Sequence, residues 1–334
     1  MKIAYVMYPG ACFMGAGDGT KMQAVVWKEG LEKKGHQVDL VNPWGGYDWK
    51  AYDIVHVFGF GLWNYDFIHW GSRVNKNFVF SPIIDSNTNL FAYKLATYLG
   101  CRKLRLFSQN YMLRVLKEDI RLFFARTEYE ASYLTKGYGI SPENVALVPL
   151  SYRFDHNDDR ILKEPFCLFA GTMTQERKNV RRLIEAAIKY KFRLVLAGNT
   201  GNEASLKSLT SLIGDHKNIE IRGFVSEEEL IDLYNRAKVF ALPSLNEGVG
   251  LVALEAAVHR CNIVITRLGG PKEYYGDRAY LVDPYNVDEI GQSILKAMDD
   301  SVSQPGLRDY LSGNYSTEHC ADLLENAYRK VSLK

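Results

Sequence analysis

The sequence predicts an α/β protein of two doubly wound, parallel-sheet domains that face each other across a cleft. Short apolar, β-branched runs alternate with longer segments of helical periodicity along almost the whole chain, which is typical of β-α-β crossover units. The 334 residues exceed what one core usually holds, and a polar stretch at 155–160 follows a strand-like run. We therefore expect an N-terminal domain over residues 1–150, a C-terminal domain over 151–315 and a closing helix within 316–334.

Each half of the chain contains a series of short apolar runs that we predict to be strands. Those of the first half are Ile3–Met7, Val38–Val41, Asp53–Phe58 and Phe78–Ile84, with a helix at Thr20–Lys34. Those of the second half are Phe166–Ala170, Arg193–Ala197, Ile219–Arg222, Val239–Pro243, Ile263–Thr266 and Tyr280–Val282. The helices expected in this half are Val180–Tyr190, Glu203–Leu212, Glu227–Ala237, Gly250–His259, Val287–Asp299 and Ser316–Val331. Ligands of such sheets bind in the loops that follow the strands.

Composition and charge exclude several classes of protein. The 41 basic and 39 acidic side chains leave a net charge of +2, which is too balanced for a dedicated nucleic-acid binder. The five cysteines form no C-x-x-C pair, so neither a disulfide framework nor a zinc site is expected. No stretch approaches the ~20 apolar residues of a membrane-spanning helix, and the N-terminal run is too short for a signal peptide. We expect a cytoplasmic protein.

The most informative segment, residues 239–257, joins an apolar strand to a helix through a glycine-rich turn. The strand ends at Pro243 and the helix begins near Gly250, so Glu247 is expected at the carboxyl end of a strand. Glu255 follows eight positions later on the same helix. The alternative is that Glu247 only complements the helix dipole and that Glu255 is a solvated surface acid.

The turn before this helix predicts an anion-binding site. The first N–H groups of a helix lack partners within it and lie at its positive end, so they attract phosphate. The expected donors are the backbone N–H groups of Gly248, Val249, Gly250 and Leu251.

This segment resembles the E-x7-E signature of the retaining, nucleotide-sugar-dependent glycosyltransferases of family 4, which have the two-domain GT-B architecture. Three further segments resemble this family. The first is a strand that leads through a glycine to an Arg-Lys-Asn turn, the second is a nucleobase loop and the third is another glycine-rich turn. They are Phe169–Asn179, Arg222–Glu228 and Arg267–Glu273. The resemblance covers residues 165–300 and, more loosely, 1–150, and it implies a nucleotide-sugar donor on the C-terminal domain and an acceptor on the N-terminal domain.

The resemblance implies a role for each residue of the donor site. Glu247 would contact the donor sugar and stabilise oxocarbenium-like charge, or act as a nucleophile as in retaining glycosidases. Glu255 would accept hydrogen bonds from the ribose hydroxyls, since a carboxylate accepts from two neighbouring donors. Phe224 and Val225 would frame the nucleobase. For this type of transferase the resemblance favours attack on the face that the nucleotide leaves, with the departing phosphate as base.

The leaving nucleotide requires positive charge, because negative charge develops on its phosphate as the glycosidic bond breaks. The sequence contains no D-x-D triplet and its seven histidines are scattered, so we expect no metal and no cofactor. Arg177 and Lys178 follow the Gly171–Thr172 turn and could neutralise the phosphates, the arginine as a planar fork and the lysine as a point charge. We expect them to be catalytic together with Glu247; the alternative is an exposed basic turn.

A second glycine-rich loop, residues 15–20, follows the first predicted strand. It resembles the family loop that closes over the donor phosphates and the acceptor, through Gly17, Asp18 and Gly19. The alternative is a flexible connection with an N-cap. Because neither G-x-G-x-x-G nor G-x-x-x-x-G-K-[ST] occurs, the sequence does not support a dinucleotide dehydrogenase or a P-loop NTPase.

Besides a helix-end variation at His259–Cys261, the sequence departs from the family pattern at two places that bear on the site. Many members have an arginine where this chain has Thr172, so part of the basic clamp is absent or passes to Arg177. A histidine often follows the strand that corresponds to Phe80–Asp85, and here there is none. His56 and His69 are possible substitutes, although each also has a structural interpretation.

Residues 91–126 contain eight basic and two acidic side chains, interleaved with aromatic residues. One interpretation is a surface that makes peripheral contact with an anionic membrane at its inner face and suits a lipid-linked acceptor. The other is an ordinary pair of helices with solvated Lys and Arg over an aromatic core.

Together these observations predict a retaining, metal-independent hexosyltransferase of polysaccharide biosynthesis. It would transfer a sugar from a UDP- or GDP-linked donor to a hydroxyl of a glycan or lipid-linked acceptor. The alternatives are a sugar-nucleotide epimerase, which would act on the donor without an acceptor, and an inactive sugar-nucleotide-binding scaffold.

Overall fold

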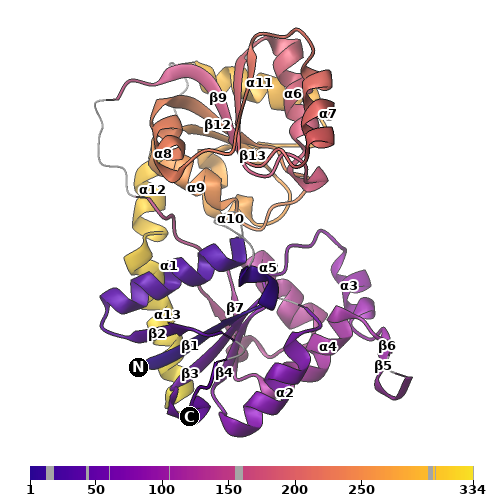
Figure 1. Ribbon diagram of the computed structural model, residues 1–334, viewed down its shortest axis with the longest axis vertical. Helices are drawn as coiled ribbons and strands as arrows, with labels where there is room; N and C mark the ends of the chain where they lie inside the picture. Colours follow the sequence, from indigo (N-terminus) through magenta and orange to yellow (C-terminus); the bar gives the residue numbers. More distant parts are fainter. Residues whose placement is uncertain are drawn as a thin grey trace. The chain divides into compact units, whose positions relative to one another are not determined.

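The chain forms two α/β units, each with its own six-stranded sheet (Figure 1). The computed structural model describes residues 1–12, 19–42, 45–59, 61–104, 106–154, 161–299, 304 and 306–333. Unit 1 consists of Met1–Leu150 and Thr317–Lys334, and unit 2 of Ser151–Ser316. The C-terminal helix therefore belongs to the first unit.

The sheet of unit 1 is parallel and has the order β2-β1-β3-β4-β7-β8. Its strands are β1 (Lys2–Met7), β2 (Gln37–Leu40), β3 (Ile54–Phe58), β4 (Phe78–Ser81), β7 (Leu122–Ala125) and β8 (Val145–Leu147). From β1 the chain builds the sheet first on one side, through β2, and then on the other, through β3. The direction of winding therefore changes between β1 and β3, which is where sheets of this kind bind ligands.

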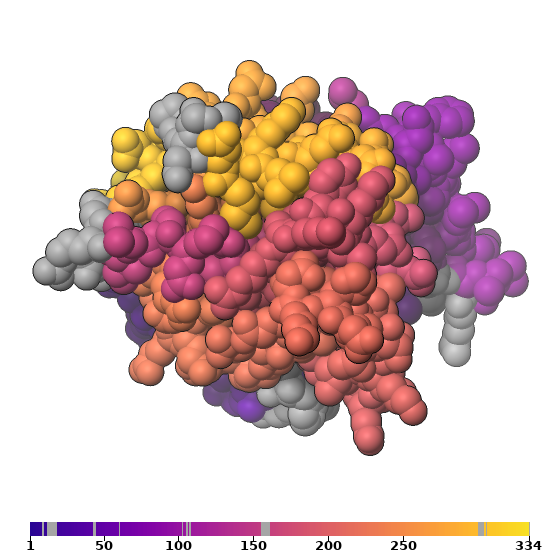
Figure 2. Space-filling model, turned by 90° about the horizontal axis from the view of Figure 1, so that it is seen from above, coloured from indigo at the N-terminus to yellow at the C-terminus, as the bar shows by residue number. Residues whose placement is uncertain are grey.

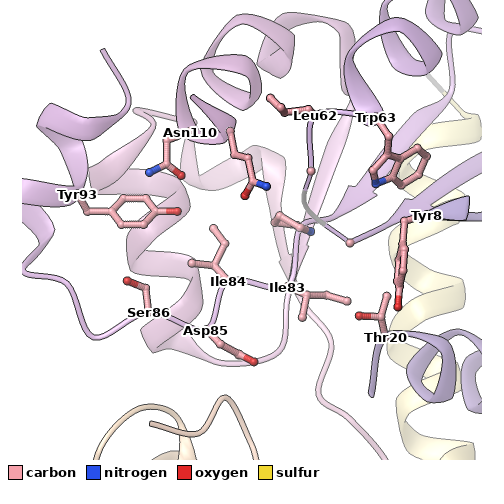
Figure 3. Close-up of a pocket in the computed structure, with 14 residues that line it drawn as sticks. Tyr8, Thr20, Leu62, Trp63, Ile83, Ile84, Asp85, Ser86, Tyr93 and Asn110 are labelled. Atoms are coloured by element: carbon pink, nitrogen blue, oxygen red, sulfur yellow. The ribbon is translucent and has the colours of Figure 1, made fainter. Parts of the chain in front are cut away.

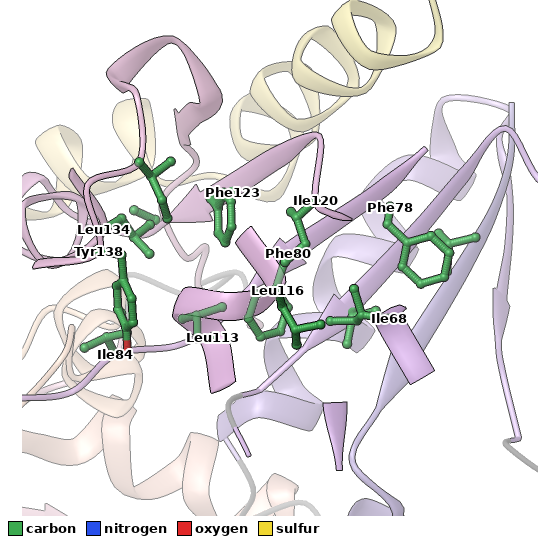
Figure 4. Close-up of a cluster of buried hydrophobic side chains, with 14 of the residues drawn as sticks. Ile68, Phe78, Phe80, Ile84, Leu113, Leu116, Ile120, Phe123, Leu134 and Tyr138 are labelled. Carbon is green, nitrogen blue, oxygen red and sulfur yellow. The ribbon is translucent and has the colours of Figure 1, made fainter. Parts of the chain in front are cut away.

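Helices cover both faces of this sheet, which explains why β3 and β4 are buried along their whole length. One face packs against α1 (Gly19–Lys33) and α13 (Thr317–Ser332), with Trp27 and Tyr328 in the core. The core on the other face includes Ile68 and Leu113 (Figure 4). The remaining helices of the unit are α2 (Asn64–Val74), α3 (Leu90–Ala96), α4 (Gln109–Leu116) and α5 (Glu128–Ser132).

The sheet of unit 2 is also parallel, with the order β11-β10-β9-β12-β13-β14. Its strands are β9 (Glu164–Ala170), β10 (Arg193–Ala197), β11 (Ile219–Gly223), β12 (Ala237–Leu242), β13 (Asn262–Thr266) and β14 (Tyr280–Val282). The chain winds from β9 through β10 to β11 and then returns to pair β12 with the free side of β9. The switch in direction lies between β9 and β12.

Several helices of unit 2 begin at a residue whose side chain caps the helix. Ser226 and Glu229 form a capping box at the start of α8 (Glu227–Arg236). Figure 2 shows one face of this unit, formed by the pink to yellow part of the chain. The other helices are α6 (Val180–Tyr190), α7 (Glu203–Ile213), α9 (Leu251–Val258), α10 (Pro271–Tyr275), α11 (Val287–Met298) and α12 (Leu307–Asn314).

The structure confirms the predicted class of two parallel α/β domains but corrects two details in the first half. The strand predicted at Phe78–Ile84 ends at Ser81, because Pro82 has no N–H to continue the ladder and Ile83 has a positive φ of 61°. The segment 91–126, interpreted as basic helices, also contains the buried strand β7 and the short β5–β6 pair. Leu122–Ala125 is apolar on both faces and short, so periodicity does not distinguish it from a helix.

His56 lies at the centre of unit 1 and is fully buried on β3. Its Nε2 lies 2.8 Å from the Ser81 hydroxyl, and its Nδ1 contacts the Tyr328 hydroxyl of α13. Burial lowers the pKa of His56 well below its ordinary value, since the charged imidazolium is poorly solvated there. The structure therefore assigns His56 to the core, whereas His69 pairs with Asp119 on the surface.

The free energy of unfolding should fall as the pH drops below about 6.5, because the unfolded chain then protonates His56 and the folded chain does not. Between pH 6.5 and 5, the free energy of unfolding should change less steeply with pH in the His56→Gln variant. The difference in slope should be up to about 1.4 kcal/mol per pH unit. Urea titrations at several pH values measure it. The exposed His216→Gln variant is the control, and equal slopes in all three proteins would contradict the prediction.

Candidate active site

Three loops of unit 2 meet at the carboxyl ends of β9, β12 and β13, next to the switch in winding direction. The N–H of Leu245 donates to the carbonyl of Arg177 over 2.7 Å, and the N–H of Gly270 donates to the carbonyl of Glu247 over 3.1 Å. The side chain of Asn179 donates to the carbonyl of Pro243 over 2.8 Å. The loops therefore fix one another through hydrogen bonds to backbone carbonyls.

The centre of this site is the carboxylate of Glu247, which is held by two cations from the loop after β9. Arg177 Nη1 lies 3.3 Å from Oε1, and Lys178 Nζ lies 3.0 Å from Oε2. The side chains of Glu247 and Lys178 are 9% and 14% exposed, while that of Arg177 is 38% exposed. The three residues expected to be catalytic thus lie together, with one more positive than negative charge.

Gly269 allows this arrangement because its backbone passes against that of Glu247. The two residues form a parallel bridge, and Gly269 has a φ of +96°. A Cβ at this position would lie 2.0 Å from the carbonyl oxygen of Glu247. Only glycine fits, both for the conformation and for the close approach.

Glu255 is fully buried in α9 and makes an ion pair with Arg153. Arg153 donates from Nη2 to Oε2 over 3.1 Å and also from Nε to Oε1, and the Tyr234 hydroxyl donates to Oε2 over 3.2 Å. Burial raises the pKa of Glu255 above its ordinary value, and the hydrogen bonds and charge of Arg153 oppose this. The interpretation of Glu255 as a solvated surface acid is therefore wrong.

The glycine-rich turn brings further predicted residues to the same edge of the sheet. Gly250 precedes α9 with a φ of +81°, and it has no side chain that could cap the first N–H groups of the helix. Leu251 is the first helical residue and Val249 is buried. Gly248 lies between Glu247 and these residues.

Of the other predicted donor residues, Gly171 and Thr172 lie on the loop after β9, and Phe224 and Val225 lie on the loop after β11. Gly171 follows β9 and donates its N–H to the carbonyl of Ala197 over 3.0 Å, and Thr172 is half-buried beside it. Phe224 is 82% exposed after β11, next to the half-buried Val225. Of the N-terminal loop, Gly17 and Asp18 lie outside the described residues, and Gly19 begins α1.

Unit 1 has a cavity of about 660 Å³ at the carboxyl ends of β1, β3 and β4, at its own switch in winding direction. Aromatic and polar side chains surround it (Figure 3). None of the described lining residues is a histidine. They are Tyr8, Thr20, Gly59, Gly61, Leu62, Trp63, Pro82, Ile83, Ile84, Asp85, Ser86, Tyr93, Gln109 and Asn110.

A buried ion pair holds the loop that forms one wall of this cavity. Glu130 is 1% exposed and accepts a hydrogen bond from the N–H of Ile84 over 2.6 Å. Its other oxygen pairs with Arg126, which also reaches Asp85 over 2.7 Å. These contacts keep Ile83 in the left-handed region, which costs a β-branched residue roughly 1–3 kcal/mol.

Sequence reasoning did not assign a function to Arg153 or to most of the residues around the cavity. Arg153 lies in the segment interpreted as a seam between domains, and its partner Glu255 is a hundred residues away, so spacing carried no signal. Asp85 also pairs with a residue that is distant in sequence, Arg126. Asp85 could have been found from its position in a loop that follows a strand, because sheets of this kind bind ligands there.

The described residues contain no group of three or more His, Cys, Asp or Glu side chains that could hold a metal ion. The charged residues of the site in unit 2 instead form the cluster around Glu247 and the pair between Arg153 and Glu255.

Comparison with known proteins agrees with this fold and these loops. Residues 152–318, half of the chain, match the family described as "Glycosyl transferases group 1". The O-antigen chain mannosyltransferase B of Escherichia coli is 31% identical over 176 residues, which are 49% of this chain and 45% of that protein. The chain spans less than two thirds of the length of the first curated relatives that it matches.

Solved structures with the GT-B architecture resemble almost the entire chain. Sucrose-phosphate synthase from Thermosynechococcus elongatus superimposes with a TM-score of 0.76 at 16% identity, covering 99% of this chain and 98% of that one. HepE from Anabaena, solved with UDP and glucose, gives a TM-score of 0.72 at 14% identity, covering 99% and 100%. The chain belongs to the group 1 glycosyltransferases and has their two-domain GT-B fold.

The Gly269→Ala variant should be destabilised by more than about 3 kcal/mol, because its Cβ forces the Glu247 loop to move. Gly214→Ala is the matched control, since Gly214 also has a positive φ but open space around it. We expect the control to lose only about 1–2 kcal/mol. Denaturant unfolding measures both, and equal losses would show that the close approach is unimportant.

The Arg153→Met variant should lose about 3–5 kcal/mol, because Glu255 would remain buried without a compensating positive charge. The double variant Arg153→Met/Glu255→Gln should be more stable than this single variant, since no buried charge remains. A double-mutant cycle by urea unfolding measures the coupling. Strictly additive losses would refute an interaction between the two side chains.

Proposed function

We propose that this protein is a retaining glycosyltransferase of family 4 that transfers a sugar from a UDP- or GDP-linked donor to a glycan or lipid-linked acceptor. The observation that carries the proposal is the Glu247 carboxylate held between Arg177 and Lys178 at the switch point of unit 2. Membership of the group 1 glycosyltransferases supports the same reaction class.

The donor phosphates would bind beside this cluster. Arg177, which is partly exposed, and Lys178 supply two positive charges, and the N-terminus of α9 begins after Gly250 without a side-chain cap, as suits an anion. Their combined charge would stabilise the phosphate as the sugar departs, without a metal ion. HepE, a protein of the same fold, was solved with UDP, which supports a uridine donor as one of the two choices.

Glu247 would stabilise positive charge on the sugar rather than form a covalent bond with it. Both of its carboxylate oxygens already accept from cations, so its lone pairs are less available for nucleophilic attack. The departing phosphate would then accept the proton of the acceptor hydroxyl. The product would keep the anomeric configuration of the donor.

Glu255 would bind the ribose hydroxyls, as the E-x7-E resemblance implies. In the structure its carboxylate is occupied by Arg153 and Tyr234. A nucleoside would therefore have to share this carboxylate with Arg153 or displace the guanidinium.

The acceptor would bind the cavity of unit 1. Its aromatic side chains Tyr8 and Trp63 offer flat apolar faces for sugar rings, while Asp85 and Asn110 offer hydrogen bonds to hydroxyls. The similarity to an O-antigen mannosyltransferase supports a polysaccharide as the product.

The Glu247→Gln variant should lose at least about 100-fold in kcat while its melting temperature changes little. A thermal-shift screen of UDP, GDP and ADP first identifies the base, because a ligand that binds only the folded state raises its stability. Release of nucleotide from the matching sugar nucleotides, with glycan acceptors and with or without EDTA, then measures turnover. Glu318→Gln, an exposed acid on α13, is the control.

Four outcomes would contradict the proposal. Conversion of the sugar nucleotide without an acceptor would indicate an epimerase. Nucleotide binding without turnover would indicate an inactive scaffold. Equal activity of the Glu247→Gln and Glu318→Gln variants would remove Glu247 from the reaction. Complete loss of activity with EDTA would refute metal independence.

A further inference from the structure

Exposed apolar side chains are concentrated in one short segment of unit 1. Of the seventeen large apolar side chains that are exposed in the described part of the chain, six lie within residues 91–106. Scattered exposed leucines are ordinary, but a contiguous group marks an interaction surface. The six are Phe91, Leu95, Tyr98, Leu99, Leu104 and Leu106.

Two adjacent elements present these side chains. On α3 and the turn after it, Phe91, Leu95 and Tyr98 follow a spacing of four and three residues, which places them on one side of the helix. The β5–β6 pair (Gly100–Cys101 and Leu106–Phe107) follows directly, and Leu104 lies in its connection. Figure 1 shows this pair projecting from the edge of unit 1 beside α3.

The opposite side of this segment is anchored to the domain. Tyr93 is 6% exposed and packs edge-to-face on Tyr133, with its hydroxyl 3.0 Å from that of Tyr138. A Cβ at Gly100 would lie 2.4 Å from the ring of Tyr111, so the β5–β6 pair packs tightly on α4. Packing of Tyr93 and Gly100 against the rest of unit 1 therefore leaves the apolar residues on the other side exposed to solvent.

The surface is also basic. Lys94 and Lys103 are exposed among the apolar residues, and the guanidinium of Arg114 stacks 3.6 Å from the ring centre of Tyr98. The sequence adds Arg102 and Arg105 to the same stretch. The two acids of residues 91–126 lie elsewhere, beyond the end of α4, where Asp119 pairs with His69.

We propose that this surface, formed by α3 and the β5–β6 pair, docks on the anionic headgroups of a phospholipid bilayer. Apolar side chains of this size bury themselves below the headgroups, while neighbouring lysines and arginines attract anionic lipid. No helix among the described residues is long and apolar enough to cross a bilayer, so contact would be peripheral.

The charge pattern favours a bilayer over a second copy of this chain. A self-complementary interface would place the basic residues of one copy near those of the other, which is repulsive. An anionic lipid surface instead complements every basic residue of the patch at once.

Cosedimentation of the full chain with vesicles tests this proposal. Vesicles of phosphatidylcholine with 30% phosphatidylglycerol should bind the protein at low ionic strength, and pure phosphatidylcholine should bind it at least tenfold less. Leu104→Glu/Leu106→Glu should reduce binding at least tenfold, and Lys94→Glu/Lys103→Glu should do so as well. The controls are Leu162→Glu and Lys217→Glu, exposed residues of the same types on unit 2, which should bind as the unchanged protein does.

Absence of binding to anionic vesicles at low salt would overturn the proposal, as would equal losses in the control variants. Size-exclusion chromatography with light scattering tests the alternative that this surface forms a dimer. If the unchanged protein is a dimer and Leu104→Glu/Leu106→Glu is a monomer, the surface serves self-association and the proposal is wrong. Circular dichroism and melting temperature verify that each variant is folded. None of these measurements depends on sugar transfer, so the result stands whether or not the proposed function does.

Discussion

The site in unit 2 depends on one constraint: a nearly buried carboxylate must have compensating charge, and Glu247 obtains it from two cations on a different loop. Because the parallel sheet changes its winding direction between β9 and β12, the loops after these strands are neighbours although they are seventy residues apart in sequence. The backbone bond between Leu245 and Arg177 fixes their separation. Sheet topology, loop geometry and electrostatics therefore all favour the placement of Glu247 beside Arg177 and Lys178.

In unit 1 a buried carboxylate is likewise compensated by a cation, and here the ion pair also offsets backbone strain. There a buried pair of Glu130 and Arg126 holds the loop after β4 and keeps Ile83 in a conformation that few β-branched residues adopt. Strain of this kind persists only where surrounding contacts exceed its cost. This strained loop forms one wall of the cavity. There Arg126, which follows β7, pairs with Asp85, and Glu130 of α5 accepts from the N–H of Ile84.

Much of the fold was predictable because apolar periodicity is local, and strands such as β9, β12 and β13 are short runs between clear helices. The clustering of Arg177, Lys178 and Glu247 followed from their places after strands. The partner of Glu255 could not be predicted in this way, because Arg153 lies in a segment whose sequence indicates only a connection between the domains. The existence of β7 also required tertiary information, because burial on both faces removes the alternation that identifies a strand. The end of β4, in contrast, is signalled in the sequence by Pro82.

The assignment of α13 to the first unit makes unit 2 an insertion within unit 1. During synthesis the ribosome must produce all of Ser151–Ser316 before Tyr328 can reach His56 and close one face of the first sheet. Until then Trp27 and Phe124 lack part of their cover. The second unit can complete its core earlier, so the order of folding would be the reverse of the order in which the two sheets begin.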